Sequence, residues 1–530
     1  MIYNTISKRH SDALFRLIKS LGKAEKRALA LEMEKTGHGN KKYALLYRAL
    51  ENMKHYHETD LIEKCPDIKP AQVPNLKRNL YRFILNTLSD FHAARTPEIR
   101  IMKQMEGAWI LFNKGLYMDA ELELKKSKNM AHALDRKGYA IALSRLEKLL
   151  LRQNPIGMDL EVLNALSKRE SDLLEQIREE TRFKDLYLLL NARYREQGFI
   201  SDKTGYEKIK EHILKKLGKL PIRESGPVAR IYYLKCHISF ALFSQDFKMA
   251  FDYSKKLVSL FNAEKDSIKK FPELYLGALN HALVSCHKLG RLADFNHFYS
   301  LLLRFSRNPG LIKNENLEIL VFRYKYLHKI NHHFLTGEFT RGIKIIKPAE
   351  NMLERWAGRM NPHDALLFYY KLACLYFGAG HFRKSLKWLG KITGDYPPEF
   401  RQDLQAFARI LTLICYYEQN DFRGMEYMLR STYRFLAKKS EMHSFFNQIA
   451  ATLRKFLSKD ANPKKLKSHF ETLHSRLKPL SRKPYQSKPF LYFDILSWLE
   501  GKIKNRTVEE IIQEKAAEKL KGEFSRKKRL

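Results

Sequence analysis

The fold of this chain is decided by a stretch in its second half, YYKLACLYFGAGHFRKSLKWLGKITGDYP, residues 369–397. Large apolar side chains recur every three or four residues on both sides of Gly380, which is the spacing of one helix face. Glycine at the turn and Pro397 at the end mark where the two helices stop. The stretch therefore predicts two antiparallel α-helices that pack against each other as a hairpin.

The same arrangement recurs along the chain. Each copy has an apolar helix, a turn at Gly or a polar residue, a large apolar or aromatic residue two positions later, and a second helix. The turns lie around positions 115, 245, 290, 337, 380 and 420. Two further candidate turns, 153–155 and 197–199, fill the long gap after the first. The sequence thus predicts about eight hairpins in succession.

Residues Tyr369, Leu372, Ala373 and Tyr376, the turn and the closing proline resemble the tetratricopeptide repeat. That repeat has a period of ~34 residues, whereas paired-helix repeats of other families run to roughly 40–47. The turns from 245 onward are 40 to 47 residues apart. We therefore expect an all-α protein, a right-handed superhelical solenoid of antiparallel helix hairpins with elongated, tetratricopeptide-like repeats.

Three domains are expected: an N-terminal helical domain at 1–96, the helical-repeat solenoid at 97–460, and a basic connector with C-terminal capping helices at 461–530. In the first domain, helices are predicted over 14–21, 43–50, 60–65 and 73–94. A further helix is predicted to begin at Gly22, where the Glu25 side chain reaches back to cap the helix start. This domain has two interpretations. It is a cap that covers the end of the solenoid, or a helix-turn-helix unit that presents Lys77, Arg78 and Arg82 to phosphates.

The chain carries a formal net charge of +39, which attracts polyanions. Basic residues are densest between 454 and 488. The candidate polyanion patch there comprises Arg454, Lys455, Lys464, Lys465, Lys467, Arg476, Lys478, Arg482, Lys483 and Lys488. The aromatic residues Tyr485, Phe490 and Tyr492 either stack on unpaired bases or pin an extended connector to the last hairpin.

Several classes of protein are disfavoured by the sequence. The longest apolar run, 274–286, is interrupted by Asn280 and His281 and is too short for a membrane span. Residues 1–10 lack the apolar core of a signal peptide. The five cysteines stand alone at wide spacing, which indicates free thiols in a reducing compartment. We expect a soluble cytoplasmic protein that contacts no membrane.

Signatures of catalysis and of cofactor binding are missing from the sequence. There is no P-loop, no GxGxxG after a strand, no HExxH and no paired-cysteine metal motif. His332 and His333 are adjacent in a helix and point in different directions, so they are expected to be packing or surface residues. We therefore predict no enzymatic activity, no cofactor and no metal.

Three stretches, 14–27, 409–435 and 493–512, resemble an uncharacterised family of bacterial helical-repeat proteins. Because they include both ends of the chain, the resemblance covers most of its length. It implies a cytoplasmic bacterial protein and carries no known activity or ligand.

Two functions follow as hypotheses. The first is an interaction scaffold of unknown pathway that binds a partner peptide or helix on the concave face of the solenoid, with Tyr369 and Tyr376 as candidate groove residues. The basic composition predicts that this partner segment is acidic. The second is a nucleic-acid-binding regulator that uses the N-terminal unit or the basic segment, with the repeats sensing a ligand. The sequence does not reveal the oligomeric state.

Overall fold

A computed structural model of the 530-residue chain describes residues 12–35, 41–153, 160–197, 199–200, 202–218, 225–264, 266–312, 314–436, 440–455, 463–483 and 487–527. All regular structure in these ranges is helical, with no strand among them, so the predicted all-α class is confirmed. None of the described helices combines the length and apolar character that crossing a membrane requires.

The chain divides into two compact units, 1–174 and 175–530. The dividing point falls within one helix, α10 (Leu160–Gln197). These units do not follow the expected boundaries at 96 and 460, because α6 contacts α7 in unit 1 and the last helix, α26, packs on α17 in unit 2.

Unit 1 contains two small cores. Its helices are α2 (Ala13–Ser20), α3 (Lys23–Lys35), α4 (Lys41–Asn52), α5 (Glu58–Glu63), the 3-10 helix η2 (Pro70–Gln72), α6 (Val73–Ala93), α7 (Pro97–Asn113), α8 (Tyr117–Ala133), α9 (Lys137–Gln153) and the start of α10. Helices α2 to α6 share one core, and α7 to α9 share another. The N-terminal helices lie within a few residues of their expected bounds.

The second helix of unit 1 starts as predicted. The backbone N–H of Gly22 donates to Glu25 Oε2 at 2.7 Å, so the glutamate satisfies a donor that the first turn leaves free. Glu25 Oε1 lies 2.7 Å from His92 Nε2. The same carboxylate therefore caps α3 and ties it to α6.

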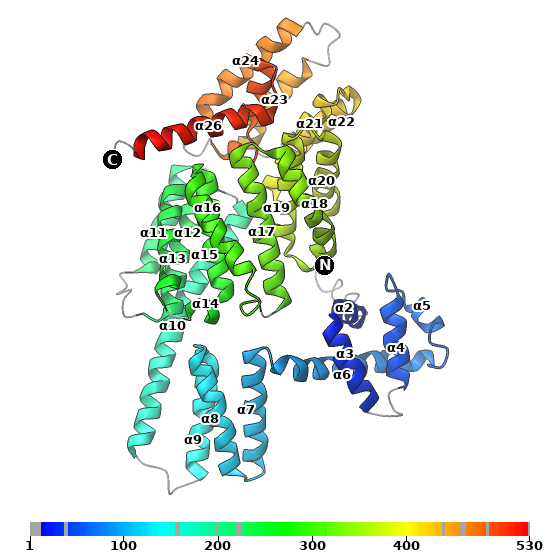
Figure 1. Ribbon diagram of the computed structural model, residues 1–530, viewed down its shortest axis with the longest axis vertical. Helices are drawn as coiled ribbons and strands as arrows, with labels where there is room; N and C mark the ends of the chain where they lie inside the picture. The colour runs from blue at the N-terminus through cyan, green and yellow to red at the C-terminus, as the bar shows by residue number, and fades with distance from the viewer. Residues whose placement is uncertain are drawn as a thin grey trace. The chain divides into compact units, whose positions relative to one another are not determined.

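Unit 2 is a run of helix hairpins followed by a C-terminal segment (Figure 1). Its helices are the rest of α10, α11 (Lys203–Leu217), α12 (Pro227–Phe243), α13 (Phe247–Ala263), α14 (Ser267–Lys270), α15 (Pro272–Leu289), α16 (Leu292–Ser306), α17 (Glu315–Thr336), α18 (Phe339–Trp356), η4 (Ala357–Arg359), α19 (Pro362–Gly378), α20 (Phe382–Asp395), α21 (Gln402–Glu418), α22 (Phe422–Leu436), α23 (Ser440–Arg454), α24 (Pro463–Leu480), η5 (Lys488–Leu491), α25 (Ile495–Lys504) and α26 (Val508–Lys527).

All six turns named from the sequence at single positions are hairpin turns with a left-handed residue. Positive φ angles occur at Gly115, Gln245, Gly290, Gly337, Gly380 and Asn420. In five of them the next N–H donates to the carbonyl five residues earlier, as in His381 to Tyr376 at 2.9 Å, which closes the helix C-terminus in a Schellman-type motif. Two further turns of this kind among the described residues, at Asp135 and Asn505, were not predicted. Of the candidate turns at 153–155 and 197–199, residues 154, 155 and 198 lie outside the described residues; α9 ends at Gln153 and α10 at Gln197.

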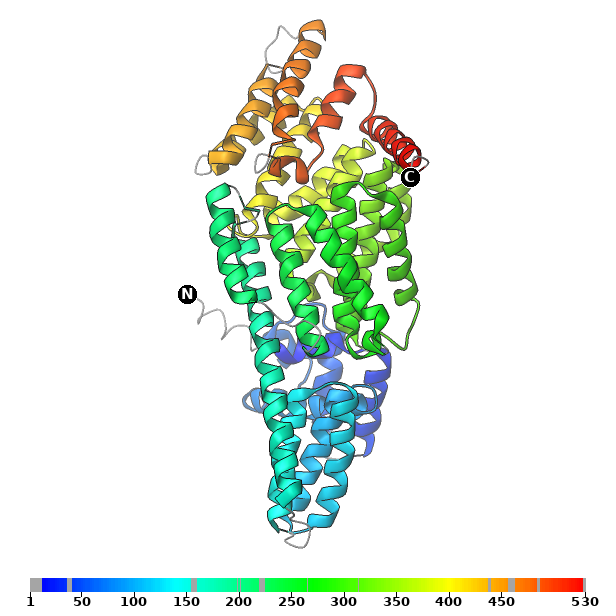
Figure 2. The same cartoon turned by 90° about the vertical axis from the view of Figure 1, so that its left-hand side faces the viewer.

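Consecutive hairpins of unit 2 pack on each other. The first helices contact one another in the order α12, α15, α17, α19 and α21, and each second helix also contacts the following hairpin. In both views these helices lie side by side (Figures 1 and 2). Close approach needs small residues at the crossings: a Cβ on Gly378 would lie 2.7 Å from the ring of Phe339.

A segment that we call the C-terminal strap, residues 487–494, runs back over the hairpins of unit 2. Ser487 Oγ donates to Gln245 Oε1 at 3.3 Å, at the turn between α12 and α13. Lys288 of α15 donates to the Leu491 carbonyl at 2.7 Å. The strap therefore joins hairpins that are distant in sequence.

Helix α26 docks on the turn between α17 and α18. Glu509 accepts hydrogen bonds from Thr340 N at 3.0 Å and Thr340 Oγ1 at 2.6 Å. Gln513 Nε2 donates to the Gly337 carbonyl at 3.3 Å. A Cβ on Gly337 would lie only 2.6 Å from the backbone N of Gln513. The final helix is thus held against unit 2 by its own chain.

The substitution Gly337→Ala is expected to destabilise unit 2 and loosen α26. A left-handed alanine costs ~1–2 kcal/mol, and the clash with Gln513 adds roughly 1–3 kcal/mol. Gly380→Ala is the matched control, since Gly380 has a similar φ and open space around it. Urea unfolding measures both. Equal losses of stability in the two variants would show that α26 does not dock at Gly337.

Candidate functional site

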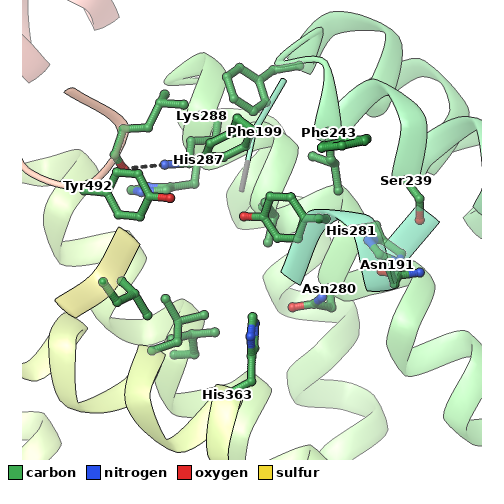
Figure 3. A pocket seen from close by; sticks show the side chains of 18 of the residues that line it. Asn191, Phe199, Ser239, Phe243, Asn280, His281, His287, Lys288, His363 and Tyr492 are labelled. Atoms are coloured by element: carbon green, nitrogen blue, oxygen red, sulfur yellow. Dashed lines mark hydrogen bonds between the residues drawn. The ribbon is translucent and has the colours of Figure 1, made fainter. Parts of the chain in front are cut away.

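The candidate site is a cavity of about 270 Å³ inside unit 2 (Figure 3). It is lined by α10, α12, α15, α17 and α19, by the start of α21 and by the strap. On α15 the lining positions are Asn280, His281, Val284, His287 and Lys288, which form one helix face. The face that each first helix turns inward therefore supplies the lining.

Two lysines give the cavity its charge. Lys288 and Lys371 both line it, and burial lowers the pKa of Lys288 to about 7 and that of Lys371 to about 8. Lys288 donates to the strap carbonyl of Leu491, whereas the Lys371 ammonium lies 4.8 Å from the centre of the Phe334 ring. Within the described part of the chain, no acceptor is found for a hydrogen bond from the Lys371 ammonium.

No aspartate or glutamate is among the described residues that line the cavity. The one guanidinium in that lining, Arg401, is already paired. It donates to both carboxylate oxygens of Asp403, at 2.8 and 2.6 Å. The two ammonium groups are therefore the uncompensated charges of this cavity.

The ion pair of Arg401 and Asp403 also anchors the strap. Tyr492 Oη donates to Asp403 Oδ2 at 2.6 Å, and its ring stacks on Phe407 at 4.4 Å. Although burial alone would raise the pKa of Asp403, its hydrogen bonds from Arg401 and Tyr492 and the charge of Arg401 lower it to about 2. This carboxylate is fully ionised at neutral pH.

The histidines around the cavity are neutral. Burial lowers the pKa of His281, His328 and His363 to about 3 each, and that of His287 well below its ordinary value. They act as hydrogen-bonding groups rather than as charges.

A polar network lies behind the wall of the cavity. His328 Nε2 lies 3.0 Å from Asn280 Oδ1, and Asn331 Nδ2 lies 3.3 Å from His328 Nδ1. Within the described residues, Asn331 Oδ1 and His287 Nδ1 are buried without a hydrogen-bond partner. Buried polar atoms are normally satisfied, so these two are available to a ligand.

The two sides of the cavity differ in character. In Figure 3, Lys288, His287 and Tyr492 lie on one side, and Ser239, His281 and Asn191 on the other. Aromatic rings close part of the wall: the centroids of Tyr194 and Phe199 are 5.3 Å apart. The cavity therefore offers charge, hydrogen-bonding groups and ring faces together.

A second cavity of about 290 Å³ adjoins the first. Lys288, Lys371 and the strap residues Leu491 and Tyr492 line both cavities. The lining of the second cavity is richer in phenylalanine, with Phe334, Phe339, Phe377, Phe490 and Phe493. Burial raises the pKa of the Cys374 thiol, which lines this cavity, to about 12, so the group is a weak nucleophile.

The two candidate groove residues are buried. Tyr369 and Tyr376 are 5% and 3% exposed. Tyr369 stacks on Trp388 at 5.5 Å, and Tyr376 Oη donates to Glu350. Both rings fill the space between the helices of their own hairpin or its neighbour, so neither is presented to a partner.

The candidate polyanion patch is solvated where it is described. Arg454, Lys455, Lys467, Arg476, Lys478, Arg482 and Lys483 are exposed. The side chains of Lys464, Lys465 and Lys488, and the whole of Tyr485, lie outside what the structure describes. The two described aromatic residues pack within the protein: Phe490 lies edge-on against Phe445 at 5.6 Å, and Tyr492 is held in the strap.

The three N-terminal basic residues differ in their surroundings. Lys77 donates to Tyr56 Oη and lies 3.6 Å from Glu58, so it holds α6 to the segment before α5 and to α5 itself. Arg78 and Arg82 are exposed on α6. Only these two of the three point to solvent.

One set of metal-ligand side chains lies close together in the described residues. Ligand atoms of His332, His333 and Glu338 are within 4.8 Å of one another. Arg341 already donates to Glu338 at 3.0 Å, and burial together with the charges of Lys329 and Arg341 lowers the pKa of His333 to about 4. These positive neighbours disfavour a bound cation.

Sequence reasoning missed the cavity. One signal was present: Asn280 and His281, which interrupt the apolar run 274–286, are lining residues. Lys288 and Lys371 gave no such signal in the sequence, because the long aliphatic stem of a lysine is compatible with many positions on a helix.

Comparison of the chain with protein-family models, with curated proteins and with solved structures finds no match. The resemblance to a bacterial helical-repeat family stays a prediction. The site must therefore be interpreted from its own geometry.

Removing one hydroxyl tests the wall of the cavity. Tyr492→Phe keeps the ring on Phe407 and leaves Asp403 with one donor fewer, so we expect unit 2 to lose ~1–3 kcal/mol of stability. Tyr427→Phe, at an exposed position of α22, is the control. Denaturant unfolding at pH 7 gives both values, and equal stability of the two variants would contradict the anchoring role.

Proposed function

We propose that this protein is a non-enzymatic helical-repeat binding protein whose cavity in unit 2 holds a small organic anion between Lys288 and Lys371. The observation that carries the proposal is a pair of buried ammonium groups in a cavity whose described lining contains no carboxylate. An uncompensated buried charge is strongly unfavourable. A chain that keeps two such charges beside a cavity gains from them when an anion is bound.

The size of the cavity favours a small ligand over a partner helix. A helix with its side chains is about 10–12 Å across, so even two turns of it exceed 270 Å³. Ligand sites commonly measure roughly 300–1,000 Å³. The acidic partner expected from the basic composition is therefore proposed as a small molecule at this site.

The solenoid expected from the sequence supports the proposal. The lining comes largely from the first helices of successive hairpins, which is the surface that a solenoid turns to its concave side. A scaffold role toward a protein partner stays a broader proposal. It rests on the hairpin architecture alone, since its two named tyrosines are buried.

Lys371→Met tests the proposal by separating stability from binding. Methionine keeps the length of the side chain and removes a buried charge, so the ligand-free protein should become more stable by ~1–3 kcal/mol. The apparent affinity for added anion, obtained from the stabilisation that the anion causes, should fall at least about tenfold in this variant. Lys387→Met, an exposed position on α20, is the control for charge. Thermal unfolding with and without phosphate and simple carboxylates measures both effects. Unchanged anion response in Lys371→Met would overturn the proposal.

The pH dependence of stability gives a second test. An unfolded lysine titrates near ~10.4, whereas burial lowers the pKa of Lys288 to about 7 and of Lys371 to about 8. From pH ~7 to ~10 the unfolded state then binds more protons, so the free energy of unfolding contributed by these groups rises with pH. The rise should be smaller in Lys371→Met than in Lys387→Met. Equal pH profiles would show that Lys371 titrates normally.

A second candidate, nucleic-acid binding, is favoured by the exposed cations of α24. Replacing Lys467, Arg476 and Lys478 with glutamine should weaken binding of a single-stranded oligonucleotide. It should also reduce the slope of log K against log salt by ~0.7 for each phosphate contact that is lost. The control replaces Lys203, Lys208 and Lys215, three exposed cations of α11. Equal affinities and slopes for the two triple variants would exclude α24 as the binding surface.

A further inference from the structure

We infer that the ligand of the unit 2 cavity is a dianion, a small organic molecule whose two negative charges lie close together, carried on a body with a flat apolar face. This inference rests on the proposed function and names the class of ligand. It follows from the charges, the open hydrogen-bonding groups and the rings of the lining.

When both lysines are protonated, charge balance requires two negative charges. Arg401 is neutralised by its two hydrogen bonds to Asp403. Lys288 and Lys371 have no acidic partner in the described lining. A monoanion would leave one of the two cations uncompensated in a poorly solvated space, whereas a dianion pairs both.

The hydrogen-bonding groups also match an anion with several oxygens. Lys371 offers three N–H donors, and Lys288 offers two beyond the one that it gives to Leu491. His287 also lines the cavity, and its Nδ1 has no hydrogen-bond partner in the described residues. Two carboxylates or one phosphate monoester have enough oxygens to accept this set.

The remaining wall sets the body of the ligand. The ring centroids of Tyr194 and Phe243 are 6.3 Å apart, and those of Phe199 and Tyr492 are also 6.3 Å apart. These four rings line the cavity together with Asn191 and Ser239. An aromatic lining favours an apolar body, and the amide and hydroxyl add places for its polar substituents.

The groups around the two lysines change charge little near neutral pH. On α15, α17 and α19, the lowered pKa values of His281, His287, His328 and His363 keep these rings neutral. Burial raises the pKa of Tyr370, Cys374 and Tyr492, so they stay protonated. Asp403 stays ionised and paired with Arg401. Asp494 and Lys519 line the second cavity only.

One further lysine lies near the site. Burial lowers the pKa of Lys235, on α12, to about 8, and its charge contributes to the lowered pKa of His281. Lys235 lies between the rings of Tyr187 and Tyr232 and does not line the cavity. Its protonation would add to the positive potential without contacting the ligand.

The test holds the ring constant and varies the charge. Titration calorimetry at pH 6.8 compares phenyl phosphate and phthalate, two dianions, with benzoate, a monoanion, and phenol, which is neutral. We expect each dianion that binds to have an affinity at least about tenfold higher than that of benzoate, a difference of ~1.4 kcal/mol in binding free energy. Phenol is expected not to bind. In Lys371→Met the dianion should lose its advantage over benzoate, whereas Lys387→Met should behave as the parent.

A pH series distinguishes the two dianions. The second ionisation of a phosphate monoester is near ~6, so the affinity for phenyl phosphate should rise from pH 5.5 to about 6.5 and then fall as Lys288 and Lys371 lose protons. An isolated carboxyl ionises near ~4; in phthalate the first carboxylate raises the pKa of the second by like-charge repulsion, so the affinity for phthalate should also rise at the acid end of the series, over a lower pH range than that for phenyl phosphate. Binding of phthalate alone would assign a dicarboxylate, and binding of phenyl phosphate alone a phosphate monoester; either supports the inference.

The outcomes separate the inference from the proposal beneath it. If benzoate binds as tightly as both dianions and Lys371→Met abolishes its binding, the anion site stands and the inference of a dianion is wrong. If no anion of the series binds, or if binding is the same in Lys371→Met, both are wrong. Circular dichroism of each variant ensures that a loss of binding is not a loss of folding.

Discussion

The hydrogen bond that closes four of the five first helices, α12, α15, α19 and α21, is the interaction on which the arrangement of unit 2 depends. It joins the N–H after a left-handed residue to the carbonyl five residues earlier, as at Arg291 and Cys286, at 2.9 Å. The chain thereby reverses within three residues, and the second helix must lie against the first. Successive first helices then contact each other, and their inner faces meet around one cavity.

If the cavity binds an anion as proposed, it shows a conflict between stability and binding. The apolar stripes of α15 and α19 would pack most stably with aliphatic residues, yet they carry Lys288 and Lys371 at inner positions. Local departures of this kind from good packing are typical of functional sites, where stability is sacrificed for recognition. The paired Arg401 and Asp403 nearby show that the same fold can neutralise a buried cation when no ligand is needed.

The sequence predicted the elements that follow from local rules. Gly290, Gly337, Gly380 and Asn420 marked turns because these residues tolerate left-handed angles. Asp135 and Arg401 adopt such angles too and gave no signal. Arg401 Nη1 lies 2.9 Å from His363 Nδ1, on α19 and 38 residues earlier, a contact that no local pattern contains. The cavity and the strap were not predictable for the same reason, since their partners lie on different hairpins.

The strap also changes how unit 2 should come apart. In a stack of repeats each repeat contacts only its neighbours, so such chains can lose structure one repeat at a time from an end. Here Ser487 is bonded to Gln245, 242 residues away, and Leu491 to Lys288, 203 residues away. These long-range bonds connect early hairpins to the C-terminal helices. Partial fraying from one end is therefore suppressed, and the cavity is completed only when residues 487–494 have been synthesised and folded back.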